Sequence, residues 1–94
     1  MKKEEIYSEV IKVVSDVTGI SEMDILKSKT EECCEARCLL VRYLSRIMPG
    51  ASIGVLINRT RQGVRAILQR EKSDSWMMVR NWKEIVKKME SKGF

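Results

Sequence analysis

Histidine is absent from this 94-residue chain, and aromatic residues are scarce, with two Trp, two Tyr and one Phe. Histidine is the commonest general base in enzymes and a frequent zinc ligand. Its absence excludes the Ser-His and Cys-His pairs of nucleophilic enzymes, and no glycine-rich phosphate loop is present. We therefore predict a non-enzyme without a small-molecule substrate. Because aromatics are few, the core must consist of Val, Ile, Leu and Met, which favours packed helices over a β-sandwich.

The chain also lacks a secretion signal and a membrane-spanning segment. The N-terminal sequence MKKEE has no apolar stretch of the kind that signal peptides need, and no uninterrupted apolar run approaches the ~18 residues of a membrane span. We therefore expect a cytoplasmic protein.

The cysteines indicate reduced thiols rather than a disulfide framework. Cys33, Cys34 and Cys38 lie close together on one predicted helix, and their number is odd. Cys34 and Cys38 share a helical face, but zinc would then need carboxylates or a second chain as further ligands. We interpret the cysteines as small core residues and expect no metal and no cofactor.

Acidic residues are missing between Glu35 and Glu71, where the sequence places Arg37, Arg42, Arg46, Arg59, Arg61, Arg65 and Arg70. Residues 1–50 carry eight basic and nine acidic side chains (net −1), whereas residues 51–94 carry ten and four (net +6). A near-neutral half joined to a basic half favours a polyanionic partner, with nucleic acid as the first candidate and an anionic membrane as the second.

Apolar residues recur at helical spacing and predict an all-α fold of five to six helices in one domain, residues 1–94. We expect a first helix over 3–18, a helical turn over 21–26, and a long helix from Thr30 to about Met48. Within the long helix, the residues available for the core are Cys34, Leu40, Val41, Leu44 and Met48.

The second half should contain three more helices, over 53–57 with Ser52 as cap, over 60–71 with Thr60 as cap, and over about 75–91. The last helix has an apolar seam of Met78, Trp82, Ile85 and Met89. We expect Trp82 to be buried against the first helix, beside Ile6, Val10 and Val13. Whatever apolar surface remains near Trp76 and Val79 could form a homodimer.

The helix at 60–71 carries the strongest functional signal. The 100° rotation per residue turns Val64, Ile67 and Leu68 to one side. The opposite side holds Arg61, Gln62, Arg65, Ala66 and Gln69. Arg and Gln reach guanine and adenine edges in bidentate fashion, and a small Ala lets the backbone approach a thymine methyl. With the short helix before it, the segment 52–71 is predicted to be a helix-turn-helix unit that binds double-stranded DNA.

We expect those five residues to contact base edges. Phosphate contacts are expected from a second, largely basic set: Lys27, Lys29, Ser52, Asn58, Arg59, Thr60, Arg70 and Lys72. The backbone amides at Ser52 and Ile53, at the start of the short helix, could hold one further phosphate.

Several segments resemble the DNA-binding domain of the bacterial replication initiator DnaA: ISEMDILKSK at 20–29, Ala36-Arg37, YLSR at 43–46, Ile53-Gly54 and NRTRQGV at 58–64. The resemblance covers roughly residues 6–70 and implies a Trp-repressor-like helix-turn-helix fold. Arg59 and Val64 fit the family's signature, whereas residues 60–63 replace side chains that supply much of its base readout. The resemblance thus implies a stand-alone relative, a small transcriptional or replication-associated regulator with a specificity of its own.

Two alternatives remain open. The basic helix or the Trp-containing last helix could serve a protein-interaction module, with Trp76 and Trp82 as its anchors. Residues 76–92, rich in Lys and Trp, could instead lie on a membrane surface, but this would leave the arginine helix unexplained.

Overall fold

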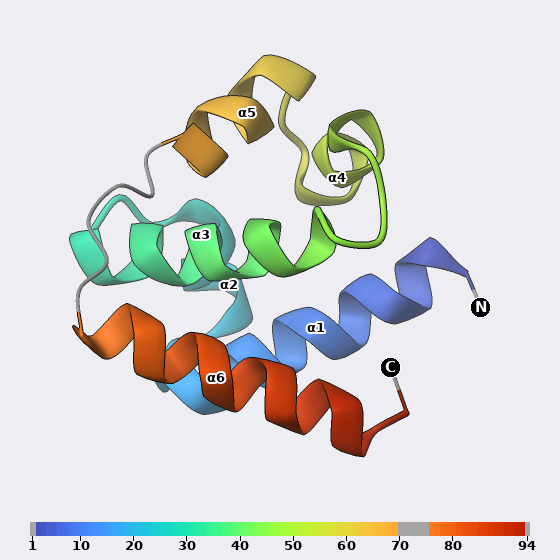
Figure 1. Ribbon diagram of the computed structural model, residues 1–94. Coiled ribbons are helices and arrows are strands. Elements are labelled where there is room, and N and C mark those ends of the chain that lie inside the picture. The colour runs from blue at the N-terminus through green and yellow to red at the C-terminus, as the bar shows by residue number, and fades with distance from the viewer. Residues whose placement is uncertain (1, 70–75, 94) are drawn as a thin grey trace.

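The computed structural model describes residues 2–69 and 76–93, and this part of the chain forms six α-helices and no strand (Figure 1). The helices are α1 (Lys3–Thr18), α2 (Glu22–Lys27), α3 (Glu31–Leu44), α4 (Gly50–Ile57), α5 (Arg61–Gln69) and α6 (Trp76–Ser91). The predicted all-α class is confirmed. Helix α3 lies in the middle, with α1 and α6 on one side of it and α4 and α5 on the other (Figure 1).

The first three helices begin or end where local chemistry demands it. Gly19 ends α1 in the left-handed conformation, at φ 74°, and donates its N–H to the Ser15 carbonyl. Ser21 caps α2 by accepting a hydrogen bond from the Asp24 amide, and Thr30 caps α3 by accepting one from the Cys33 amide. The predicted bounds of α1 and the predicted start of α3 are therefore correct.

Helix α3 ends earlier than expected. Its α-helical part stops at Leu44, and residues 45–47 continue as turns, with the Arg46 amide bonded to Tyr43 O and the Ile47 amide to Leu44 O. Pro49 disfavours the helical conformation in the residue before it, so the chain tightens into shorter hydrogen-bonded turns. Met48 is nevertheless buried, as predicted.

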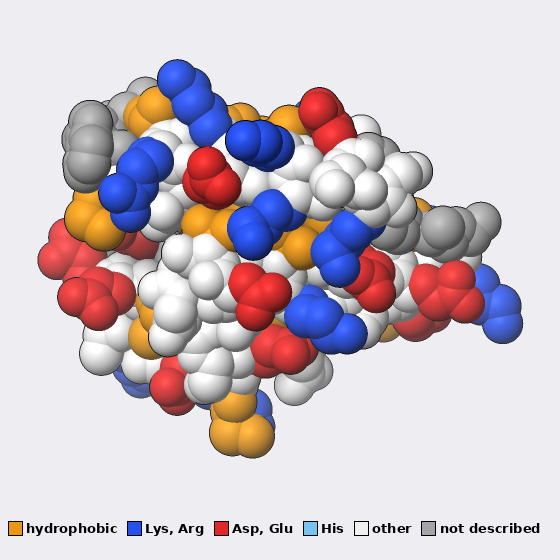
Figure 2. Space-filling view, turned by 90° about the horizontal axis from the view of Figure 1, so that it is seen from below, with side chains coloured by type: hydrophobic (Ala, Val, Ile, Leu, Met, Phe, Trp, Pro, Cys, Tyr) orange, Lys and Arg blue, Asp and Glu red, His pale blue; other side chains and the backbone are white. Residues whose placement is uncertain are grey.

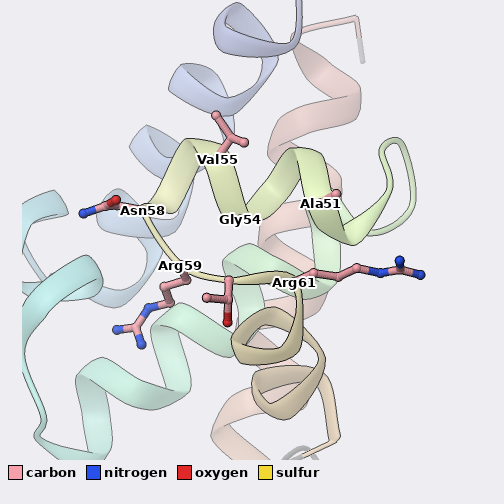
Figure 3. A pocket seen from close by; sticks show the side chains of 7 residues that line it. Ala51, Gly54, Val55, Asn58, Arg59 and Arg61 are labelled. Carbon is pink, nitrogen blue, oxygen red and sulfur yellow. The ribbon is translucent and has the colours of Figure 1, made fainter.

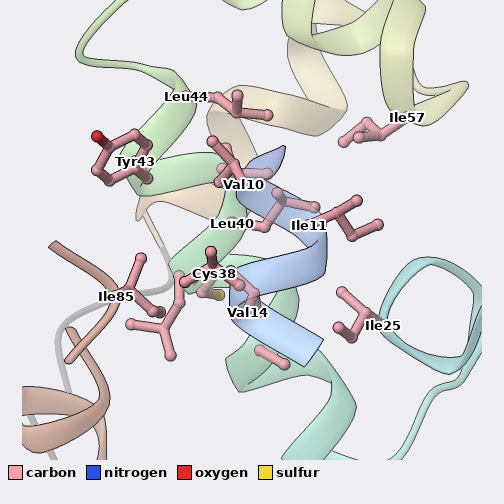
Figure 4. Packing of buried hydrophobic residues seen from close by; sticks show 14 of the residues in the cluster. Val10, Ile11, Val14, Ile25, Cys38, Leu40, Tyr43, Leu44, Ile57 and Ile85 are labelled. Atoms are coloured by element: carbon pink, nitrogen blue, oxygen red, sulfur yellow. The ribbon is translucent and has the colours of Figure 1, made fainter. Parts of the chain in front are cut away.

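The core is aliphatic. Side chains from α1, α2, α4 and α6 meet those of α3 in one cluster (Figure 4). The fully buried ones include Val10 and Val14 of α1, Leu40 and Leu44 of α3, and Ile85 of α6. Each buried side chain of this size contributes about 1.5–3 kcal/mol to the free energy of folding, so these contacts dominate the stability of the domain.

Two core predictions need correction. Cys34 is only half-buried, while Cys33 and Cys38 are buried and the Cys38 thiol donates to the Ile67 carbonyl at 3.6 Å. Trp82 is half-buried rather than buried, and its ring lies beside Tyr43 of α3, with 6.1 Å between the ring centroids. The seam of α6 is narrower than predicted: Met78, Ile85 and Met89 are buried within the chain, and Trp82 lies at its edge.

Candidate nucleic-acid interface

Helix α4 begins three residues earlier than the sequence suggested. Pro49 occupies the N-cap position, without a side-chain cap, and the helix starts at Gly50. Ser52 is therefore inside the first turn, where its amide bonds to Pro49 O and its hydroxyl accepts a hydrogen bond from Lys3 Nζ at 3.1 Å. The predicted cap at Ser52 is wrong. The amides left for an anion are those of Gly50 and Ala51 rather than those of Ser52 and Ile53.

The turn between α4 and α5, residues 58–60, is held tightly against α4. Asn58 ends α4 in the left-handed conformation, at φ 58°, and the Arg59 amide donates to Gly54 O at 2.8 Å. A Cβ atom on Gly54 would lie 2.4 Å from the Arg59 carbonyl oxygen, which no real side chain tolerates. Glycine at this position therefore fixes how closely the turn, and with it the start of α5, approaches α4.

Helix α5 divides into a buried side and an exposed side. Thr60 Oγ1 accepts a hydrogen bond from the Gly63 amide at 3.0 Å, as predicted for its cap. Val64 is fully buried, and Ile67 and Leu68 pack partly against the core. The five predicted base-contacting residues are all exposed: Arg61, Gln62, Arg65, Ala66 and Gln69.

An open concavity of about 670 Å³ lies where α4 meets the start of α5 (Figure 3). Ala51, Val55 and Asn58 line it from α4 and its end, and Arg61 lines it from α5. Val55 is 82% exposed, an unusual position for a valine, and its exposure could not be inferred from a segment in which nearly every residue is apolar.

Arg59 and Arg61 leave the turn in opposite directions (Figure 3). Arg61 extends into solvent beside the concavity, whereas Arg59 reaches α2, where its Nη2 donates to Leu26 O at 3.3 Å. The predicted phosphate contact by Arg59 thus competes with an internal hydrogen bond that ties the turn to the end of α2.

Arg37 holds the same end of α2 from the other side. This arginine is 7% exposed, and it donates from Nε to Ile25 O at 2.8 Å and from Nη2 to Ser28 O at 2.6 Å. The last carbonyls of a helix carry partial negative charge and lack partners, so a buried guanidinium satisfies them well. The sequence carries no signal for this role, because Arg37 is one of several arginines in an acid-free stretch.

The remaining predicted phosphate contacts are dispersed. Lys27, at the end of α2, and Lys29, in the loop after it, are both exposed. Asn58 and Thr60 are exposed in the turn. Arg70 and Lys72 lie outside the described residues.

The charge on this face is of one sign. From Gly50 to Gln69 the only charged side chains are Arg59, Arg61 and Arg65. The face formed by α1 and α6 differs, because Lys, Arg, Asp and Glu side chains are interspersed there (Figure 2). A polyanion would therefore be attracted to the α4–α5 face more than to the α1–α6 face.

Comparisons of the chain with protein-family models, curated proteins and solved structures find no match. Within residues 2–69 and 76–93, no helix is both long and apolar enough to cross a membrane. The same residues contain no group of three Cys, Asp or Glu side chains arranged to hold a metal ion.

Proposed function

We propose that this protein binds double-stranded DNA in a sequence-specific manner, with α5 in the major groove. The observation that carries the proposal is the division of α5: Val64 is buried in the core while Arg61, Gln62, Arg65, Ala66 and Gln69 are exposed without a carboxylate on the helix. This leaves guanidinium and amide groups directed outward, and these are the groups that read base edges bidentately.

The arrangement around α5 supports a helix-turn-helix mode of docking. Helix α4 precedes α5 by three residues, 58–60, and the Gly54 contact fixes the turn. In this mode, α4 would cross the DNA backbone, so that the amides of Gly50 and Ala51 contact a phosphate. Arg61 at the mouth of the concavity would lie nearest to the bases, and exposed Val55 could contact sugar or a thymine methyl.

Lys27 and Lys29 would contact the DNA backbone beside the helix-turn-helix unit. Such contacts would fix the position of the protein on the duplex but would not select a base sequence. Arg37 and Arg59 would act within the protein, because both hold the end of α2 on which these lysines lie. The resemblance to the DnaA domain agrees with this reading and favours a small regulator of transcription or replication in the cytoplasm.

Selection of bound duplexes from a random pool tests the proposal directly. We expect a defined preferred site, and binding to it that weakens steeply with salt, because arginine and lysine contacts release counterions. With about four to six phosphate contacts, the slope of log K against log salt should be about −4 to −5. A pool without enrichment, together with a slope near zero, would contradict the proposal.

A further inference from the structure

A second exposed surface, on the side of α3 away from α5, combines aromatic, apolar and cationic side chains. We call it the α3–α6 patch and define it as Arg46, Ile47, Val79, Trp82 and Val86, together with the buried Tyr43 ring that lies against Arg46 and Trp82. Ile47 is 49% exposed and Val79 is 42% exposed, while Trp82 and Val86 are half-buried. Val79, Trp82 and Val86 follow at spacings of three and four, so they share one face of α6.

The arginines of this surface are held in place by rings. The Arg46 guanidinium lies 5.4 Å from the Tyr43 ring centroid and 5.9 Å from that of Trp82, and the Arg42 guanidinium lies 5.5 Å from the Trp82 centroid. Cation–π contacts of this length are attractive and limit the rotamers of the arginine. A guanidinium that is already ordered loses less entropy when it binds a carboxylate.

Arg46 has no carboxylate within ion-pair distance in the described part of the chain, and its contacts are the two rings. Trp, Tyr and Arg are also the residues most enriched among interface hot spots. Arg46 is thus an ordered cation without a carboxylate partner. It is followed by exposed Ile47 and lies against Trp82, whose face of α6 also carries exposed Val79, and this is the composition of a protein-binding surface.

We infer that the α3–α6 patch binds an acidic amphipathic helix of a partner protein. Charge complementarity selects this occupant. A second copy using the same face would bring Arg46 close to its own equivalent, which like charge disfavours. A nucleic acid would neutralise Arg46 but leave Ile47 and Val79 in water. A helix with a leucine seam and flanking glutamates satisfies both groups, because its leucines can cover the aliphatic side chains while its glutamates pair with Arg46.

The test uses a synthetic peptide with leucines at helical spacing and glutamates at the other positions. Its control has the same leucines with lysine in place of glutamate. We expect the acidic peptide to bind and to shift the amide resonances of residues 43–47 and 79–86, and the lysine peptide not to bind. This inference is independent of DNA binding by α5.

Two charge reversals provide matched variants. Arg46→Glu should weaken acidic-peptide binding by about tenfold or more, whereas Arg61→Glu, the same change on α5, should leave it within about twofold. Val79→Ser should weaken binding without any change in charge. Equal losses in the two arginine variants, resonance shifts centred on α5, no binding at all, or self-association of the protein through this patch would each overturn the inference.

Discussion

Helices α3 and α5 differ in how their side chains are used, although the two helices are in contact. Helix α3 buries nine of its residues, whereas α5 buries one, Val64. Helix α3 is in this sense a structural element, and replacing its residues changes stability. Helix α5 rests on the core through Val64 and, in part, Ile67 and Leu68, and its other side chains are available to a ligand. The molecule thus separates the residues that fold it from those proposed to bind DNA.

This comparison predicts the largest stability loss for a residue of the scaffold helices. Ile85→Ala should lower the free energy of unfolding by about 2–5 kcal/mol, because Ile85 is fully buried and its removal leaves a cavity. Chemical denaturation monitored by circular dichroism measures the loss. Val79→Ala, on an exposed position of the same helix, is the matched control and should change stability little. A small loss for Ile85→Ala would mean that α6 does not pack as described.

Gly54→Ala should affect both regions at once. The added methyl would meet the Arg59 carbonyl oxygen, so the turn must shift, at a cost of about 1–3 kcal/mol in stability. The displaced α5 should also lose DNA affinity. In Gly50→Ala, by contrast, the new Cβ would lie 3.9 Å from its nearest neighbours within the protein, so stability should persist. Denaturation and fluorescence anisotropy on the selected duplex separate the two effects. Wild-type affinity in Gly54→Ala would show that the turn does not position α5.

Replacements on α5 should change affinity without changing stability. Arg65→Ala and Gln62→Ala should each cost about 1–3 kcal/mol on the selected duplex and flatten the preference at particular base pairs. Lys29→Ala should weaken selected and scrambled duplexes alike. Anisotropy titrations with both duplexes test this, and equal losses on both for all three variants would mean that α5 supplies only charge.

The smallest effect is expected at the surface ion pair between α1 and the end of α6. Lys92 Nζ lies 3.0 Å from Glu9 Oε2, and its hydrogen bond and charge lower the pKa of Glu9 below its ordinary value. A carboxylate whose pKa is lower in the folded than in the unfolded state stabilises the fold at pH values above its unfolded-state pKa. This contribution disappears as the pH falls through its folded-state pKa. Lys92→Met should therefore melt slightly below wild type at neutral pH and together with it at about pH 3. A difference that persists in acid would assign the effect to packing.

The sequence predicts helices well where a local signal marks their start or end. Gly19, which has no side chain, ends α1, and the hydroxyls of Ser21 and Thr30 cap the starts of α2 and α3. The observed bounds follow these signals. The end of α3 and the start of α4 depend on Pro49, whose influence extends to both neighbours, and these bounds were misplaced.

Tertiary partners could not be inferred in the same way. A helical wheel places Trp82 on the apolar seam but cannot tell whether α1 or α3 covers that edge. Arg37 and Arg59 both occur in an acid-free stretch, which suggested a ligand as their partner, whereas each hydrogen-bonds to carbonyls of residues 25–28. The exposed side of α5 was predictable, because it follows from the period of the helix once Val64 is assigned to the core.

The most direct test of the central claim is an NMR titration of the ¹⁵N-labelled protein with the selected duplex. We predict that amide shifts concentrate in residues 50–69 and around Lys27 and Lys29, and that residues 78–91 of α6 remain unperturbed. Shifts confined to α6, or equal shifts with a duplex of unrelated sequence, would contradict the proposal that α5 reads DNA.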